Sequence, residues 1–177
     1  LQVVDVTDPS APTLTATLVT SGRARDVVLS ADGNTAYVAD DEGGLKIINV
    51  SDSNAPILQA TLDTSGKAMA VRLSADGNTA YVTDQSNGLQ IVDISDSSNP
   101  ILKSTLDTSG LAWRVALAAD ENTAYVADRT GGLQIVDVSD SSNPSLTYTL
   151  DTSGEAWGVM LSPNGNTAYV ADADGGL

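Results

Sequence analysis

The sequence predicts an all-β fold in which four similar units each form a sheet of four antiparallel strands. Short β-branched segments alternate with Gly, Asn, Asp and Ser turns at a spacing of about 11 residues, which leaves no room for a helix. A second observation is an internal repeat of 44 residues, typical of propellers and solenoids. Cutting before each recurring Leu gives units that align without a gap, 1–44, 45–88, 89–132 and 133–176, with Leu177 opening a fifth.

The third unit shows how the four strands follow one another. Its first strand is the β-branched run 89–94, which the turn sequence Ser-Asp-Ser-Ser-Asn-Pro ends. The next strands are predicted at 101–106, 113–117 and 123–127, each followed by a segment rich in Gly, Asn or Asp. Such short connections join neighbouring antiparallel strands in a meander.

The turn before the last strand of a unit carries residues that suit a tight hairpin. Asp32-Gly-Asn34 recurs as Asp76-Gly-Asn78, and Gly and Asn adopt the positive φ angles that such turns need. A four-stranded meander of this length matches one blade of a β-propeller, for which the usual period is about 40–45 residues. We therefore expect a single propeller domain over 1–177.

Two motifs recur through the whole chain. One is Ala36-Tyr-Val-Ala-Asp40 followed by a Gly-rich turn, and the other is Leu133-Gln-Ile-Val-Asp-Val-Ser-Asp140. With these motifs the sequence resembles the LVIVD-repeat family of β-propellers, although 46–49 reads Lys-Ile-Ile-Asn and lacks the Val-Asp pair. The resemblance implies a repeat of bacterial and archaeal surface or secreted proteins, without a common activity.

The resemblance also implies where the blades begin. Its innermost strand is the one before Ala-Tyr-Val, here 27–29, and its outermost is the Pro-x-Leu strand. Both ends of the chain then fall inside a blade: 1–18 supplies the third and outer strands, and 159–171 supplies the inner two. One blade is thus split two plus two between the termini, a device that removes exposed sheet edges.

Two ways of closing the ring are open. The four blades could close within one molecule as a four-bladed propeller, or two chains could form an eight-bladed homodimeric ring with the split blades completed in trans. The absence of Phe and the recurrent Ala, Val, Thr and Leu favour the dimer, because small side chains allow flatter packing between blades. A third reading, prompted by Leu1, is a processed chain or a fragment of a longer array.

Comparing the four units separates scaffold positions from variable ones. An Asn-Thr-Ala-Tyr-Val run and a Val-x-Leu pair are identical in all four, and identical blades bury identical faces. The variable positions lie just before the inner strand and in the turn after Ala-Tyr-Val-x-Asp. In a propeller these two loops share one face of the ring, and loops on a rigid scaffold commonly carry binding residues.

This variable face holds the candidate partner-binding residues. It carries both tryptophans and five of the eight basic residues of an otherwise acidic chain, and Trp and Arg are enriched in binding hot spots. In the opposing interpretation, the exposed loops vary without a functional reason, and the two tryptophans fill the axial channel of the propeller. The candidates are Arg23, Arg25, Lys67, Met69, Trp113, Arg114, Arg129 and Trp157.

Composition excludes several classes of function. The chain has no Cys and no His, so thiol nucleophiles, disulfides, histidine bases and the usual zinc, copper and haem sites are excluded. A net charge of −15, from 23 acidic and 8 basic residues, disfavours a nucleic-acid partner, because phosphate binding is driven by Lys and Arg. No stretch reaches the ~20 apolar residues of a membrane helix, and no basic-then-apolar leader opens the sequence.

Recurrent aspartates suggest two further chemistries. Asp40 and its equivalents follow the Ala-Tyr-Val strand, and Asp52 and its equivalents begin the Ser-Asp-x-x-x-Pro turn. Their oxygens suit calcium, but no Asp-x-Asp-x-Asp spacing gathers ligands in one loop, so we expect turn capping and no cofactor. A pair of carboxylates could also serve glycoside hydrolysis, although nothing singles out a pair.

These observations predict a non-enzymatic binding or scaffold module of an extracellular or surface protein. It would present variable loops on one face to a protein or glycan ligand. Two alternatives remain at this point: a purely structural repeat domain without a ligand, and a carboxylate-based hydrolase acting on glycans.

Overall fold

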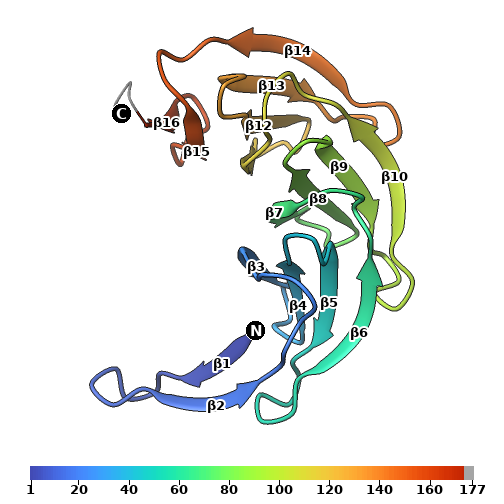
Figure 1. The fold of residues 1–177 in the computed structure, drawn as a ribbon, viewed down its shortest axis with the longest axis vertical. Helices are drawn as coiled ribbons and strands as arrows, with labels where there is room; N and C mark the ends of the chain where they lie inside the picture. The colour runs from blue at the N-terminus through green and yellow to red at the C-terminus, as the bar shows by residue number, and fades with distance from the viewer. Residues whose placement is uncertain (174–177) are drawn as a thin grey trace.

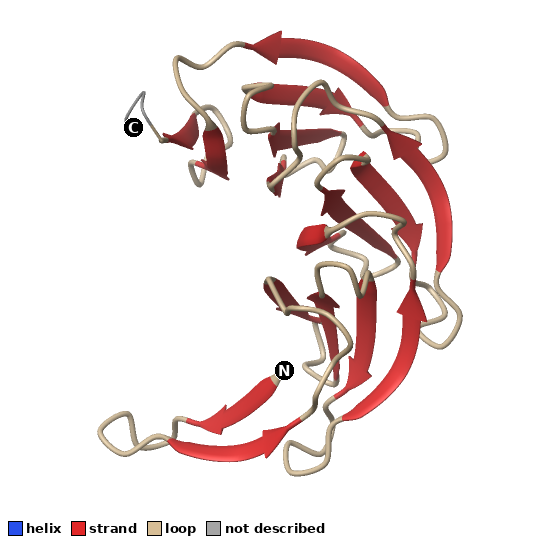
Figure 2. Cartoon of the chain, viewed as in Figure 1, coloured by secondary structure: helices blue, strands red, loops and turns tan. Residues whose placement is uncertain are grey.

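The computed structural model describes residues 1–173 as an open arc of antiparallel sheets, and this part of the chain contains no helix (Figures 1 and 2). Residues 174–177, which include the end of the fourth repeat and Leu177, lie outside the described range. The predicted all-β class is therefore confirmed. Each strand pairs with its sequence neighbour, as short hairpin connections require.

Three blades are complete, and each is a sheet of four strands in sequence order from the inside of the arc to the outside. The first contains β3 (Asp26–Leu29), β4 (Thr35–Ala39), β5 (Leu45–Asn49) and β6 (Ile57–Leu62). The second contains β7 (Ala68–Leu73), β8 (Thr79–Asp84), β9 (Gly88–Asp93) and β10 (Ile101–Leu106). The third contains β11 (Arg114–Leu117), β12 (Thr123–Ala127), β13 (Leu133–Asp137) and β14 (Ser145–Leu150).

Each end of the arc holds a two-stranded sheet. At the N-terminal end β1 (Gln2–Asp5) pairs with β2 (Thr13–Thr17), and at the C-terminal end β15 (Ala156–Leu161) pairs with β16 (Ala168–Asp172). By their repeat positions these sheets correspond to the outer and the inner strands of a blade, so each end of the chain supplies two strands, as predicted, while their union in one blade stays a prediction. The two halves are separate sheets at opposite ends of the arc, and the described residues do not form a closed four-bladed ring (Figure 1).

The core lies between successive blades. Tyr37 and Val71 belong to one buried cluster that joins the first complete blade to the second, and Tyr81 and Val115 belong to another that joins the second to the third. The invariant tyrosines Tyr37 and Tyr81 are each 4% exposed, which agrees with the predicted packing role of this position. Stability therefore accumulates from contacts between neighbouring blades, as in other repeat proteins.

Recurrent aspartates shape the turn between β3 and β4 and the turn between β5 and β6. Asp32 Oδ1 accepts hydrogen bonds from the Ser30 hydroxyl at 2.5 Å and from the Asn34 backbone N–H at 3.0 Å, while Gly33 has φ of 73°. The Ser30 and Asn34 hydrogen bonds lower the pKa of Asp32 below its ordinary value. Asp52 likewise accepts the backbone N–H of Asn54 at 2.9 Å. The predicted turn capping is confirmed at these positions.

Candidate functional site

The two variable loops of each blade meet on one face of the arc, as predicted. Asp40, at the end of β4, accepts the Thr20 hydroxyl at 2.6 Å on Oδ1 and the Gly22 backbone N–H at 2.8 Å on Oδ2. It thereby ties the turn after β4 to the loop that leads into β3, which we call the lead-in loop. The hydrogen bond from the Gly22 N–H to Asp40 thus joins residues 18 positions apart in the sequence, whereas the sequence analysis predicted that such aspartates cap only their own local turn.

The same aspartate recurs in the next two blades, where it is also fully buried. Asp128 repeats the pattern, with the Thr108 hydroxyl at 2.6 Å on Oδ1 and the Gly110 N–H at 2.7 Å on Oδ2. Asp84 instead accepts the Gln90 side-chain amide at 2.9 Å on Oδ2, and its Oδ1 has no partner among the described residues. Burial raises the pKa of both Asp84 and Asp128.

Each variable turn is also anchored to the following blade. Asp41 and Ala68 exchange two backbone hydrogen bonds of 3.0 Å, and Arg129 forms the same pair with Ala156 at 2.9 and 3.1 Å. Asp41 and Arg129 have positive φ angles of 54° and 47°, which point their side chains out of the regular strand geometry. The variable side chains therefore stand at the junctions between blades on a fixed backbone.

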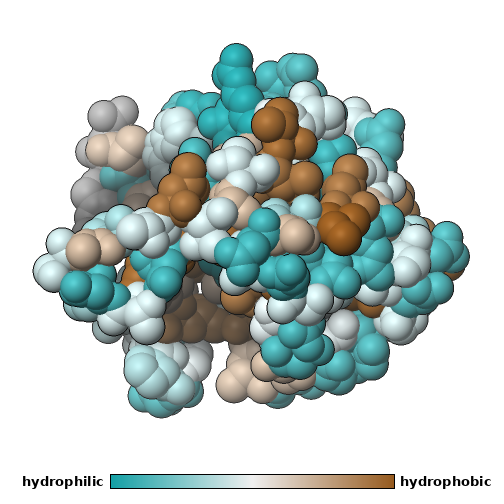
Figure 3. Space-filling model, turned by 90° about the horizontal axis from the view of Figure 1, so that it is seen from below, coloured by the Kyte–Doolittle hydropathy of each residue, from teal (hydrophilic) through white to brown (hydrophobic). Residues whose placement is uncertain are grey.

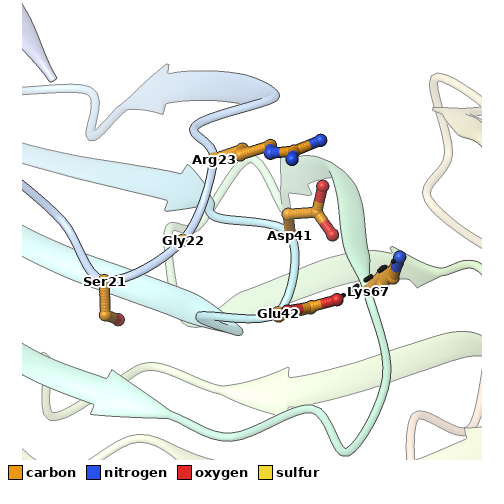
Figure 4. A pocket seen from close by; sticks show the side chains of 6 residues that line it. All are labelled: Ser21, Gly22, Arg23, Asp41, Glu42 and Lys67. Carbon is orange, nitrogen blue, oxygen red and sulfur yellow. Dashed lines mark ion pairs between the residues drawn. The ribbon is translucent and has the colours of Figure 1, made fainter.

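One of these junctions contains a pocket of about 250 Å³ between the first and second complete blades (Figure 4). It is lined by Ser21, Gly22, Arg23, Asp41, Glu42 and Lys67. In Figure 4 the side chains of Arg23, Asp41 and Glu42 project to the same side, and Lys67 Nζ lies 3.4 Å from Glu42 Oε1. The structure thus brings the candidates Arg23 and Lys67 to one pocket.

Arg25 stands next to this pocket and holds Asp41. Its Nε donates to Asp41 Oδ2 at 2.9 Å, and its Nη2 contacts the same oxygen. Burial opposes ionisation of Asp41, but the hydrogen bond and charge of Arg25, together with the charges of Lys67 and Arg23, outweigh it and lower the pKa of Asp41. Asp41 is therefore a buried carboxylate whose ionised form is favoured by the neighbouring cations.

The tryptophans meet at another junction of the same face. Trp113 and Trp157 pack edge to face with ring centroids 4.7 Å apart. The Arg129 guanidinium lies 4.2 Å from the Trp157 ring centroid and 5.4 Å from that of Trp113, and its Nη2 donates to Glu155 Oε2 at 2.6 Å. Three candidates from separate parts of the sequence thus form one cluster, which we call the tryptophan cluster (Trp113, Arg129, Glu155 and Trp157).

Arg114 lies apart from both groups. Its Nη1 pairs at 2.9 Å with Asp26 Oδ2, to which Arg72 Nη1 also donates at 2.9 Å. These residues lie on the inner strands β3, β7 and β11, so the ion pairs cross the inner wall of the arc. Sequence comparison missed Arg72, whose only signal was a basic residue where the other units have Val28, Ala116 and Met160.

Met69 is not exposed on the variable face, so it is not available to contact a partner. It occupies the same repeat position as Arg25, Trp113 and Trp157, but its side chain is 3% exposed within β7. Met69 lies in a bulge between Ala68 and Ala70, as Trp157 does between Ala156 and Gly158, but Met69 is buried at an inner junction of the arc whereas Trp157 lies at its end. We therefore remove Met69 from the candidate binding residues.

Neither a metal site nor a membrane-spanning helix is found in the described part of the chain. Residues 1–173 contain no group of three or more Asp or Glu side chains that could hold a metal ion. No helix of sufficient length and hydropathy for a membrane span occurs within that range.

The repeat pattern identifies the family. The model of the LVIVD repeat matches residues 1–20, 21–64, 65–108, 109–152 and 153–177, and so covers the whole chain. The chain belongs to the LVIVD repeat family. The boundaries of the matched repeats coincide with those of the structural blades, since the match at 21–64 contains β3 to β6. Our division at each Leu has the same 44-residue period but cuts through the blades.

Solved structures show the same propeller architecture at low sequence identity. The periplasmic gluconolactonase PpgL of Pseudomonas aeruginosa is 18% identical with a TM-score of 0.86, and the match covers 98% of this LVIVD chain and 56% of that chain. A proposed 6-phosphogluconolactonase of Bacteroides fragilis is 15% identical with a TM-score of 0.82, covering 98% and 57%. The Cps50 (Swd1) β-propeller domain of Myceliophteria thermophila is 16% identical with a TM-score of 0.76, covering 98% and 60%.

These likenesses establish the fold of the LVIVD chain. The chain spans a little more than half the length of the three solved chains. No protein in the curated set has a significantly similar sequence. What the neighbours do is therefore considered below only as a proposal for this chain.

Proposed function

We propose that this LVIVD chain is a non-enzymatic binding module, which recognises a protein partner through the face that carries its variable loops. The tryptophan cluster is the observation that carries this proposal. Trp157 is 36% exposed at the end of the arc, and the Arg129 guanidinium beside it is only partly buried. Trp and Arg side chains held rigidly on a surface are the residue types that dominate protein-binding hot spots.

The charge distribution around the tryptophan cluster favours binding of a specific partner over nonspecific association. The chain as a whole is strongly acidic, whereas Arg129 adds a cation between two aromatic rings and pairs with a single carboxylate, Glu155. Figure 3 shows apolar groups separated by hydrophilic side chains over much of the side of the molecule that it presents. Export to the cell surface or outside is part of the proposal, and the periplasmic name of one structural neighbour supports it.

Trp157→Ala is expected to abolish capture of a protein partner while leaving the fold in place. The change removes the edge-to-face contact with Trp113, worth about 0.5–1.5 kcal/mol, and the ring under Arg129. The measurement uses the immobilised 177-residue chain as bait for an extracellular protein fraction, followed by thermal unfolding of each variant.

Tyr148→Ala is the matched control, because Tyr148 is 60% exposed on the outer strand β14, away from the variable loops. The proposal requires a protein that the parent and Tyr148→Ala retain and Trp157→Ala loses. Equal capture by all three chains would contradict it. Hydrolysis of a lactone or glycan by the parent chain, lost on replacing one carboxylate, would establish an enzyme instead.

We also propose that a second copy of the chain completes the ring. Val27 is 50% exposed on β3, whereas its equivalents Val71 and Val115 are fully buried by the preceding blade. Tyr169 on β16 is 54% exposed, whereas Tyr37 and Tyr81 are 4% exposed. The inner strands β15 and β16 of a second copy have the sequence pattern that would pair with β1 and cover Val27.

The repeat predicts the register of this pairing. In the complete blades Ala36 pairs with Ile48 and Ala124 pairs with Val136, and the equivalent residues at the two ends are Ala168 and Val4. Because the chain lacks Cys, a Val4→Cys and Ala168→Cys chain is expected to oxidise to a species of twice the 18.1 kDa mass.

Val3→Cys with Ala168→Cys is the control, since one residue of slip turns the side chain to the other face of the sheet. A disulfide within one chain, a ladder of longer oligomers, or equal cross-linking by both pairs would each contradict completion of the ring by a second copy.

A further inference from the structure

We propose that a pocket on the inner side of the arc binds a small zwitterion with an apolar side chain, the chemical class of an apolar amino acid. The pocket has a volume of about 380 Å³ and lies between the ends of β7, β11 and β15 and the turn that follows β11 (Figure 1). The lead-in loops of the variable face enter these strands at their opposite ends, so the pocket lies away from that face. Its walls come from one copy of the chain, and the proposal depends on neither the protein-binding role nor the second copy proposed above.

Most of the pocket wall is apolar. The larger apolar side chains that line it are Leu73, Val115, Leu117, Val159, Met160 and Leu161. The hollow is present at this junction because Ala116 is the smallest residue at its repeat position, where the other units have Val, Arg or Met. An apolar wall with a few polar groups and a volume above about 300 Å³ is usual for small-molecule sites. The pocket therefore suits a ligand with an apolar side chain.

The third repeat departs from the other three at this pocket. Ala118 stands where the other units have Ser, and Glu121 stands where they have Gly. Those glycines have φ angles of 71–73°, and Glu121 keeps a positive φ of 57°, a conformation that Gly adopts freely and Glu does not. Its Oε1 accepts the backbone N–H of Ala75 in the preceding blade. The fold thus holds a carboxylate beside the pocket at a position where the hairpin itself requires only glycine, and such strain is typical of functional positions.

Glu121 gives one part of the pocket a negative charge. Its side chain is partly buried, and no cationic group of residues 1–173 lies within ion-pair distance of it. Asp76 and Asp120 lie in the two adjacent turns, where both are exposed and accept the backbone N–H groups of Asn78 and Asn122. Their charges add to the negative potential around Glu121. An ammonium group is therefore favoured here, since it donates hydrogen bonds to the Glu121 carboxylate.

Arg72 gives another part of the wall a positive charge. Its Nη1 donates to Asp26 Oδ2 at 2.9 Å and to the Val71 carbonyl oxygen at 2.6 Å, while its Nε and Nη2 donate to no acceptor among residues 1–173. Asp26 also pairs with Arg114, so two guanidinium groups share one carboxylate. The Arg72 side chain is 39% exposed, and its remaining N–H groups can therefore form charge-assisted hydrogen bonds with an incoming carboxylate.

The two charged parts of the pocket select the ligand together. Arg72 and Glu121 both line the pocket, and no ion pair joins them, so a ligand between them can contact both. A ligand with only a carboxylate is repelled by Glu121 and the acidic turns, and one with only an ammonium group is repelled by the two guanidinium groups. An apolar amino acid carries both charged groups on one carbon and leaves its side chain for the apolar wall.

Three ligands with the same phenyl ring test the assignment on the 177-residue chain: L-phenylalanine, hydrocinnamate, which lacks the ammonium group, and phenethylamine, which lacks the carboxylate. Titration calorimetry is expected to show at least tenfold tighter binding of L-phenylalanine than of either analogue. Ala116→Met places the residue of the fourth unit in the hollow, and we expect it to abolish binding of all three ligands.

Glu121→Gly tests the carboxylate without disturbing the hairpin, because it restores the residue of the other three units at this positive φ angle. We expect this variant to fold, as thermal unfolding would show, and to bind L-phenylalanine no more tightly than hydrocinnamate. Glu42→Gly is the control of equal charge change. Glu42 lies on the variable face, 3.4 Å from Lys67 Nζ, and this variant is expected to bind L-phenylalanine as the parent does.

The assignment is overturned if L-phenylalanine does not bind at millimolar concentration, or if either analogue binds as tightly. It is also overturned if Glu121→Gly and Glu42→Gly have equal effects on binding, because Glu121 would then serve only to link its turn to Ala75.

Discussion

Replacing Gly110 with alanine is expected to lower the free energy of unfolding by about 3 kcal/mol. A Cβ at this position would lie 2.1 Å from the Asp128 carbonyl oxygen and 2.5 Å from the Gly131 backbone nitrogen. Backbone atoms on both sides cannot yield without breaking the 2.7 Å bond from the Gly110 N–H to Asp128 Oδ2. The lead-in loop of β11 would then separate from the turn after β12. Urea unfolding followed by tryptophan fluorescence measures the loss.

Gly158→Ala is the matched control for this prediction. A Cβ at Gly158 meets only the Ala171 Cβ at 3.7 Å, which is ordinary contact, and the equivalent residue of the second complete blade is the buried Ala70. We expect its unfolding free energy to stay within about 1 kcal/mol of the parent. Equal losses in the two variants would show that close approach at Gly110 is not the cause.

Removing the carboxylate is expected to have opposite effects at Asp128 and at Asp84. Asp128→Ala leaves the Gly110 N–H and the Thr108 hydroxyl without their acceptor in a buried site, which costs about 2–3 kcal/mol at pH 7. Asp84→Asn removes a buried charge and keeps an oxygen for the Gln90 amide. Because burial disfavours this charge and Asp84 Oδ1 has no hydrogen-bond partner among the described residues, we expect a gain of up to about 1 kcal/mol.

The pH dependence checks whether the buried charge of Asp84 is what lowers the stability of the parent chain at pH 7. Burial raises the pKa of Asp84 above its ordinary value of 3.8, so the folded chain holds a proton at this site more tightly than the unfolded chain does. The stability that this carboxyl contributes is complete below pH 3.8 and is lost as the pH rises through its folded pKa. Asp84→Asn should therefore match the parent in acid and exceed it at pH 7. A constant difference between the two chains at every pH would contradict this account.

Much of the variable face could be predicted because its loops recur at fixed places in the repeat. The lead-in loop of β3 and the turn after β4 were expected on one face, and the bonds from Thr20 and Gly22 to Asp40 place them there. The grouping of candidates within that face could not be predicted. Arg129 lies between two tryptophans and Arg114 reaches Asp26 two blades away, and both depend on how neighbouring blades are rotated.

Met69 shows why the repeat alone misjudges some positions. Its equivalents in the other units are Arg25, Trp113 and Trp157, so the pattern places it among variable loop residues. Trp157 occupies the same bulge in β15 and is 36% exposed at the end of the arc, whereas Met69 is buried between complete blades, so the burial of Met69 depends on the neighbouring blade. Arg72 was missed for the reverse reason, because its position is otherwise occupied by small or apolar residues.

The sequence by itself determined the 44-residue period, the four-strand order of a blade, its Asp-capped turns and the two strands that each end of the chain contributes. These features depend on alternation and turn chemistry within a few residues, which are local properties of the chain. Only the tertiary structure decided which loops meet across a junction, which carboxylates are buried and that the described residues form an open arc. Those outcomes depend on packing angles between blades, and small angles summed along the arc leave no signature in the sequence of one repeat.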